Sequence, residues 1–136
     1  METYRGYVMT DEIDSNGHMN VQFYTKKFDL ASGQLLARIG YDFQDDMHEN
    51  TGFAYVESTI KYLKEVMEDS PIHVISEIYE VGNKVVTVKH SLIHSVKNTV
   101  HSECHMKWVL FDKQIRKSIV LPESLSIALK ASIKKR

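Results

Sequence analysis

The sequence has little cysteine, no excess of either charge and no long apolar run. Its single cysteine, Cys104, excludes an intrachain disulfide and fits a reducing compartment. The 17 basic and 18 acidic residues leave a formal net charge of −1, whereas nucleic-acid-binding proteins usually show a strong basic excess. No apolar run approaches membrane-spanning length, and residues 1–5 contain no apolar signal core. These absences predict a soluble, cytoplasmic protein that binds neither nucleic acid nor membrane.

Two common catalytic signatures are also missing. The chain has no glycine-rich phosphate loop and no G-x-S-x-G nucleophile elbow. Cys104 alternates with Met106 and Trp108 on the apolar side of a predicted strand. This spacing indicates a core residue rather than a nucleophile.

One stretch organises the rest of the chain: a polar turn at residues 14–20 that runs directly into a helical pattern at residues 21–39. The turn, Asp-Ser-Asn-Gly-His-Met-Asn, is rich in residues that favour turns. The helical pattern has one apolar stripe, formed by Tyr24, Phe28, Ala31, Leu35 and Ile39. Gly40 is expected to end the helix.

Asp14 is the strongest catalytic candidate in this stretch. The start of a helix carries free N–H groups and a partial positive charge, which can hold an oxyanion. A carboxylate beside it can attack a carbonyl carbon or activate water. A purely structural role, in turn formation or capping, is the commoner fate of an aspartate in such a loop.

The remainder of the sequence predicts strands and one more helix. Strands are expected at residues 4–9, 52–66, 72–81, 85–96, 100–111 and 115–121, with a hairpin turn at Gly82-Asn83 and a final helix after Pro122. Such an antiparallel sheet must bury one face, and the helix at residues 21–39 is the only element large enough to cover it. The strand at residues 52–66 is predicted in the interior of the sheet. The length of 136 residues suits one α+β domain spanning residues 1–136.

The motif D-x-x-G-H-M-N, followed by Tyr24 and an apolar helix, resembles the acyl-CoA thioesterases of the hot-dog fold, in the 4-hydroxybenzoyl-CoA thioesterase group. The longer pattern at residues 17–31 resembles a branch of thioesterase-like proteins, some of them linked to carnitine breakdown. The similarity extends over about residues 4–122. It implies an antiparallel sheet wrapped around one long central helix, and a homodimer or homotetramer whose paired subunits build the active sites.

The resemblance also implies roles for individual residues in the turn. Asp14 falls on the position of the family's catalytic carboxylate, where it would act as nucleophile or general base. Residues 17–21 would supply the main-chain N–H donors for the oxyanion. Gly17 would let the chain approach the substrate closely, and Val21 aligns with the family's carbonyl-polarising N–H. Asn20 either caps the helix or touches the thioester or water. His18 is either a second base or a packing residue in the loop or at a subunit interface.

Glu57 is a second carboxylate with two interpretations. It lies in the middle of a predicted strand, where a glutamate usually sits on the solvated face. The branch that this chain resembles also has Glu here, before the I-x-Y pattern at residues 60–62. Glu57 could therefore orient water or recognise a polar acyl group, so that two carboxylates divide the acid–base work.

Substrate binding has further candidates elsewhere in the chain. Arg116 and Lys117 follow the last predicted turn and either contact the phosphates of coenzyme A or act as edge-strand charges that block aggregation. The acidic loop at residues 41–51 is either a solvated connection or a lid with Tyr41 and Phe43 pointing inward. Several aromatic side chains could line the acyl pocket: Phe23, Tyr24, Tyr41, Phe43 and Tyr55.

The seven histidines raise the question of a metal site. One cross-strand register would place His94 opposite His101 and His90 opposite His105. A register shifted by one residue pairs the apolar side chains instead, and register follows the apolar face. The apolar pattern therefore argues against a four-histidine metal site.

Together with the resemblance, the motif and the predicted elements indicate an acyl-CoA thioesterase. It would release the free acid and coenzyme A with no metal or other cofactor. A hot-dog hydratase or dehydratase is the first alternative, although that branch spaces its Asp and His five residues apart and here the spacing is four. A non-catalytic acyl-CoA-binding domain is the second. Loss of Asp14 would have favoured it, and Asp14 is present. The aromatic candidates are compatible with an aryl, a short aliphatic or a cationic acyl group.

Overall fold

The computed structural model describes residues 1–41 and 50–133 of the chain. The chain divides into two compact units, which are described separately below. The first unit comprises Met1–Leu35, Ile60–Ser76 and His90–Cys104, and the second comprises Leu36–Thr59, Glu77–Lys89 and His105–Arg136. The single domain expected from sequence stays a prediction.

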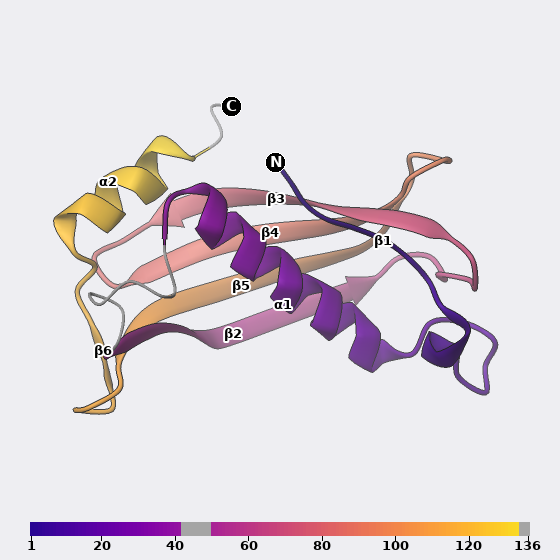
Figure 1. The fold of residues 1–136 in the computed structure, drawn as a ribbon, viewed down its shortest axis with the longest axis horizontal. Helices are drawn as coiled ribbons and strands as arrows, with labels where there is room; N and C mark the ends of the chain where they lie inside the picture. Colours follow the sequence, from indigo (N-terminus) through magenta and orange to yellow (C-terminus); the bar gives the residue numbers. More distant parts are fainter. Residues whose placement is uncertain (42–49, 134–136) are drawn as a thin grey trace. The chain divides into compact units, whose positions relative to one another are not determined.

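The elements follow the order expected from the sequence. They are β1 (Glu2–Tyr7), a 3-10 turn (Thr10–Glu12), α1 (Val21–Arg38), β2 (Thr51–Tyr62), β3 (Pro71–Val81), β4 (Val85–His94), β5 (Val100–Asp112), β6 (Lys117–Ile119) and α2 (Glu123–Ala131). The strands hydrogen-bond in the order β1-β3-β4-β5-β2, and β6 pairs with β5 (Figure 1). The long helix ends one residue before its predicted limit. None of the helices in the described part has the length and apolar character needed to cross a membrane.

The position of β2 corrects the sequence prediction. This strand lies at one end of the strand order rather than in the interior of the sheet. It also ends at Tyr62, because the N–H groups of Leu63 and Lys64 both donate to the carbonyl of His101 instead of continuing the ladder. An alternating pattern predicts an extended strand, but it does not reveal whether both edges of that strand are paired.

In the first unit, α1 begins where the sequence motif ends. The side-chain oxygen of Asn20 accepts from the N–H of Gln22 at 3.2 Å, which caps the helix. The buried side chains of α1 recur at helical spacing: Tyr24, Lys27, Phe28, Ala31, Ser32 and Leu35. Two of them are polar, and both find partners within the first unit.

The first of these partners is the buried histidine of β4. The Ser32 hydroxyl donates to the carbonyl of Phe28 at 3.0 Å, so it accepts from Nε2 of His90 at 2.8 Å. In the neutral ring, Nδ1 of His90 then accepts from the hydroxyl of Ser76 at 2.6 Å. The Ser76 hydroxyl oxygen lies 2.6 Å from that of Thr3. The His90 ring also stacks on Phe28, with ring centroids 5.8 Å apart. This network joins α1 to β4, β3 and β1.

The second partner is Glu12, which forms a buried ion pair with Lys27. The Glu12 carboxylate also accepts from the N–H of Met9 at 2.9 Å. The backbone of Glu12 is tied to the motif turn, because its carbonyl accepts from the N–H of Asn20 at 2.9 Å. The ion pair therefore anchors the segment that leads into Asp14.

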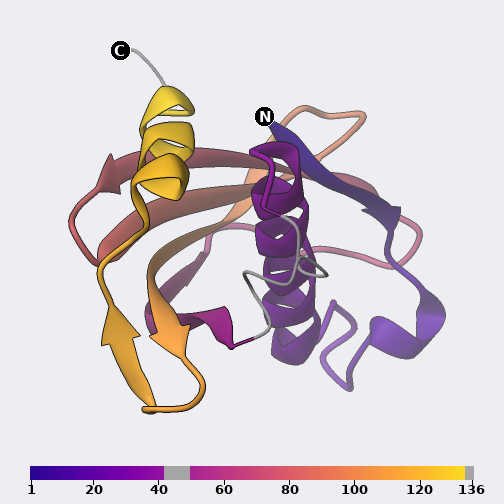
Figure 2. The ribbon, with the colours of Figure 1, turned by 60° about the vertical axis from the view of Figure 1, so that its left-hand side comes forward.

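In the second unit, β5 turns back into β6 and the chain continues into α2 (Figure 2). The core of this unit contains Trp108, whose ring lies near those of Phe53 and Tyr55, at centroid distances of 5.8 and 6.2 Å. The second unit also contains a pocket of about 270 Å³. Its apolar lining includes Tyr41, Leu110 and Leu125.

Candidate functional site

The backbone of the motif folds into a tight turn that presents Asp14. The N–H of Asp14 donates to the carbonyl of His18 at 3.0 Å, and the N–H of Gly17 donates to the carbonyl of Asp14 at 3.0 Å. Gly17 has φ of +81°, a conformation that side chains with a Cβ rarely adopt. Backbone conformation therefore favours glycine at this position.

The two carboxylate oxygens of Asp14 have different neighbours. Oδ1 accepts from the N–H of Asn16 at 2.8 Å, the bond of an aspartate-led turn. Oδ2 accepts from the side-chain amide of Asn20 at 3.2 Å. The side chain retains 21% of its exposure, so it is partly shielded yet accessible. One oxygen thus serves the turn, and the other faces neighbouring side chains.

The start of α1 offers a main-chain donor beside this carboxylate. The N–H of Val21 donates to no backbone acceptor among the residues that the structure describes. Val21 is 58% exposed, so the first residue of the helix lies at the surface. The positive end of the helix dipole lies at the same place. These features suit an oxyanion.

His18 lies between two acidic side chains. Its Nε2 is 3.9 Å from Oδ2 of Asp14, and its Nδ1 donates to Oε1 of Glu65 at 3.2 Å. Glu65, which follows β2, is absent from the residues singled out in the sequence. No local signal pointed to it, because its contact with His18 joins segments 47 residues apart.

A pocket of about 270 Å³ lies next to this turn and is called the tyrosine pocket below. It is lined by His18, Met19, Val21, Tyr24, Tyr62, Leu63, Lys64 and Glu65. The rings of Tyr24 and Tyr62 meet edge to face, with centroids 4.9 Å apart. Burial, followed by the charges of Tyr62, Glu65 and Asp14, raises the pKa of Tyr24 to about 12. Tyr24 therefore stays a neutral phenol that can line a pocket or donate a hydrogen bond.

Glu57, the second predicted carboxylate, belongs to the second unit. Its side chain is 58% exposed and lies 3.3 Å from the Nζ of Lys107, on the neighbouring strand β5. The solvated-face interpretation of Glu57 describes this environment. Its catalytic role stays a prediction.

The two predicted coenzyme A contacts also lie in the second unit. The guanidinium of Arg116 stacks over the ring of Phe111, with its central carbon 4.9 Å from the centroid, and the residue has φ of +60°. Lys117 begins β6 and pairs with Asp112 in the strand register. Both side chains are exposed. Tyr41 is buried, whereas Phe43 and the rest of residues 42–49 of the proposed lid lie outside the described residues.

Of the two histidine pairs that the disfavoured register would form, the first lies close together and the second does not. The rings of His94 and His101 are 5.8 Å apart. His90 is fully buried with both ring nitrogens engaged by serine hydroxyls, whereas His105 is exposed. Within residues 1–41 and 50–133, no group of three or more histidine, cysteine or acidic side chains is arranged to hold a metal ion.

The sequence of this chain is similar to those of known proteins. The sequence profile of the family described as the Thioesterase-like superfamily matches residues 8–129. The chain belongs to this superfamily. It is also 28% identical over 92 residues to the betainyl-CoA thioesterase of Pseudomonas aeruginosa. That match covers 68% of this chain but only 58% of the relative.

Solved structures agree with the family assignment. A thioesterase candidate from Pseudomonas putida KT2440 shares 28% sequence identity with a TM-score of 0.84, covering 98% of this chain and 84% of that one. A Staphylococcus aureus protein solved in complex with CoA is 18% identical with a TM-score of 0.89, covering 100% and 88%. The latter likeness shows the fold alone. The predicted α+β hot-dog fold, an antiparallel sheet with a long central helix, is thereby confirmed.

Proposed function

We propose that this protein is an acyl-CoA thioesterase that hydrolyses its substrate to a free acid and coenzyme A. The observation that carries the proposal is the position of Asp14. Asp14 lies in the turn that runs directly into α1, and the tyrosine pocket lies next to this turn. At the start of α1, the Val21 N–H has no backbone acceptor among the described residues. Membership of the Thioesterase-like superfamily supports the same chemistry.

The proposed reaction uses these groups in a simple order. The Val21 N–H polarises the thioester carbonyl and stabilises the charge that develops on its oxygen, whereas the N–H of Gly17 is engaged by the carbonyl of Asp14. Asp14 then either attacks the acyl carbon or removes a proton from the attacking water. Incorporation of labelled oxygen from water into Asp14 during a single turnover would identify the nucleophilic route.

The tyrosine pocket favours a cationic acyl group. Two tyrosine rings line it, and a cation over an aromatic face is attracted by the ring electrons. The carboxylates of Asp14 and Glu65 lie close enough to raise the pKa of Tyr24, although Lys64 also lines the pocket. The name of the Pseudomonas aeruginosa relative specifies a trimethylammonium acyl group.

One edge of β2 pairs with no other strand in the described part of the chain, and this supports self-association. This strand has 12 residues, and most of its side chains are exposed, including Tyr55 at 41% and Val56 at 58%. A long apolar edge strand normally needs a partner or a cover. We expect at least a homodimer, either a dimer or a tetramer. A monomer by light scattering at micromolar concentration would remove this part of the proposal.

Arg116 and Lys117 are proposed to contact the phosphates of coenzyme A. Both are exposed cations at the β5–β6 hairpin, and phosphate binding in proteins commonly uses such side chains. Replacing both with Gln should raise KM for acyl-CoA substrates and leave kcat nearly unchanged. Unchanged KM would assign them to the strand edge alone.

A panel of acyl-CoA substrates tests the central proposal through thiol release. The informative pair is betainyl-CoA and its neutral isostere 3,3-dimethylbutanoyl-CoA, which has the same shape without the charge. We expect the cationic member to be hydrolysed with the higher kcat/KM. Asp14→Asn should lower kcat by at least about a hundredfold with a smaller change in KM, whereas Asp11→Asn serves as an exposed control. Parent-like turnover in Asp14→Asn would contradict the mechanism, and consumption of an enoyl-CoA without thiol release would favour the hydratase alternative.

A further inference from the structure

The imidazole of His18 lies between two carboxylates of the first unit, bonded to one and facing the other. Nδ1 donates to Oε1 of Glu65 at 3.2 Å, and Nε2 faces Oδ2 of Asp14 at 3.9 Å. The backbone at Glu65 is itself anchored, because its carbonyl accepts from Nδ1 of His101 at 2.8 Å. Glu65 thus reaches His18 from a fixed point beside β5.

The direction of these contacts determines where the ring carries its proton. An ionised carboxylate can only accept, so the contact with Glu65 requires the proton on Nδ1 of His18. In the neutral ring, Nε2 then presents its lone pair toward Asp14. The distance of 3.9 Å is too long for a hydrogen bond. Such a separation is expected when both atoms are acceptors and no proton lies between them.

We propose that Glu65 is a positioning residue that makes His18 the proton carrier for Asp14. The proposal rests on the thioesterase function given above and concerns the route in which water attacks directly. Water oxygen bonds to the acyl carbon, and the water proton moves to Oδ2 of Asp14 and then to Nε2 of His18. The C–S bond breaks with its electron pair on sulfur, and the imidazolium returns the proton to that sulfur. The products are the free acid and the thiol of coenzyme A, with water as the only co-reactant.

A carboxylate also orients the histidine of Ser-His-Asp hydrolases, where a buried aspartate fixes the tautomer and the direction of the ring. Here the orienting side chain is 68% exposed, so it contributes little to stability. The other groups that line the pocket around His18 include Lys64, Tyr24 and Tyr62. Only Glu65 provides an acceptor to Nδ1 in the described part of the chain.

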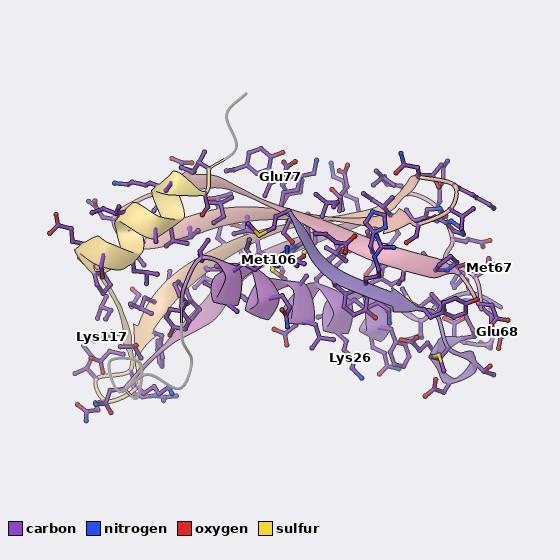
Figure 3. All side chains as sticks on the ribbon, turned by 45° about the horizontal axis from the view of Figure 1, so that its top comes forward. Lys26, Met67, Glu68, Glu77, Met106 and Lys117 are labelled. Carbon is purple, nitrogen blue, oxygen red and sulfur yellow. The ribbon has the colours of Figure 1, made fainter. Side chains whose placement is uncertain are left out.

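Two substitutions separate the hydrogen bond from the charge. Glu65→Leu removes the acceptor at similar size, and Glu65→Gln keeps an acceptor without charge. Glu68→Leu is the matched control, since Glu68 is an exposed glutamate of the same loop (Figure 3). We expect Glu65→Leu to lower kcat about tenfold, below the usual scale for losing the proton-transfer group itself. KM for the neutral substrate 3,3-dimethylbutanoyl-CoA, whose binding does not depend on the Glu65 charge, should change less than twofold, and Glu65→Gln should recover most of kcat.

A nitrogen NMR spectrum provides a readout that does not depend on turnover. The neutral His18 ring of the parent should be the Nδ1–H tautomer, and Glu65→Leu should convert it largely to the Nε2–H tautomer. Parent-like kcat or an unchanged tautomer in Glu65→Leu would overturn the proposal, as would an equal loss in Glu68→Leu. If Asp14→Asn is still inactive in that case, the proposed function stands. If the parent itself hydrolyses no acyl-CoA, the proposed function fails, and the proton-carrier role fails with it.

Discussion

The side chain of Asn20 joins the carboxylate of Asp14 to the start of α1. Its amide nitrogen donates to Oδ2 of Asp14 at 3.2 Å, while its amide oxygen accepts from the N–H of Gln22 at 3.2 Å. The helix cap expected for Asn20 is present, and the same side chain also contacts Asp14, while its contact with the thioester or water stays a prediction. The helix start and the carboxylate are positioned by one side chain.

Substitution of Asn20 should separate these two roles. Asn20→Ser keeps a good capping residue but loses the amide donor to Asp14, so we expect kcat to fall about tenfold with little change in stability. Asn20→Ala loses both, and its free energy of unfolding should fall by about 1 kcal/mol. Urea unfolding and thiol release measure the two effects. Full activity in Asn20→Ser would show that the amide contact does not position Asp14.

Glu57 offers a test of the second predicted carboxylate. Its pairing with Lys107 is exposed, and exposed ion pairs contribute little to stability. Glu57→Gln should therefore leave unfolding unchanged, and it should lower turnover less than Asp14→Asn or alter the preferred acyl group. Lys107→Gln, which breaks the same pair, is the control. A loss in Glu57→Gln as large as that in Asp14→Asn would place Glu57 in the chemical step.

The features that could be predicted from the sequence are those with local signals. The helix at residues 21–39 has a continuous apolar stripe, and the turn before it contains residues whose side chains and φ preferences act over a few positions. The partners of His18 and His90 depend on contacts 47 and 58 residues apart. Register and edge position of strands depend on such distant contacts too, which explains the misplaced β2.

Lys27 shows that a local signal can also be overlooked. It lies three residues after Tyr24, on the face of α1 that the apolar stripe occupies, and it is 3% exposed. A lysine on a buried face requires a partner, since an isolated charge cannot be removed from water cheaply. The sequence therefore contained a reason to seek an acidic residue nearby, and Glu12 fills that role.

Breaking this pair should be costly. Lys27→Met leaves the buried Glu12 carboxylate without its partner, and we expect the free energy of unfolding to fall by about 3–5 kcal/mol. Lys26→Met is the matched control, because the neighbouring Lys26 is exposed on α1 (Figure 3), and it should stay within about 0.5 kcal/mol of the parent. The double variant Glu12→Gln with Lys27→Met should recover part of the loss. Equal stability of Lys27→Met and the parent would mean that the pair is dispensable.

The same pair should affect acid stability. Burial acts to raise the pKa of Glu12, but the hydrogen bonds from Lys27 and from the Met9 N–H, together with the charge of Lys27, hold that pKa below its usual value. A carboxyl whose pKa is lowered on folding contributes stability above its unfolded pKa, and this stability is lost as pH falls through the folded pKa. The contribution of Glu12 should therefore disappear only in acid, below about pH 4.5.

His90 should give a separate pH dependence at higher pH. Burial lowers its pKa to about 4, whereas an unfolded histidine titrates near about 6.5. Between these values the unfolded chain binds a proton that the folded chain does not. The contribution of neutral His90 to the free energy of unfolding should therefore be complete above about pH 6.5. It should fall as pH drops toward 4, by up to about 3 kcal/mol in total.

His90→Gln isolates this effect from the carboxyl groups that titrate in acid. The glutamine amide can donate to Ser32 and accept from Ser76, as the neutral imidazole does, but it cannot bind the proton. Glu12 and the other carboxyl groups are common to both proteins, so the difference between the two unfolding curves reports the histidine alone. We expect the parent to lose stability from pH 6.5 to pH 4.5, measured by urea unfolding, and His90→Gln to lose much less. His105→Gln, which changes an exposed histidine, should follow the parent. If His90→Gln also follows the parent, His90 must bind its proton over the same pH range in the folded and the unfolded protein. The Ser32–His90–Ser76 network would then not hold the ring neutral.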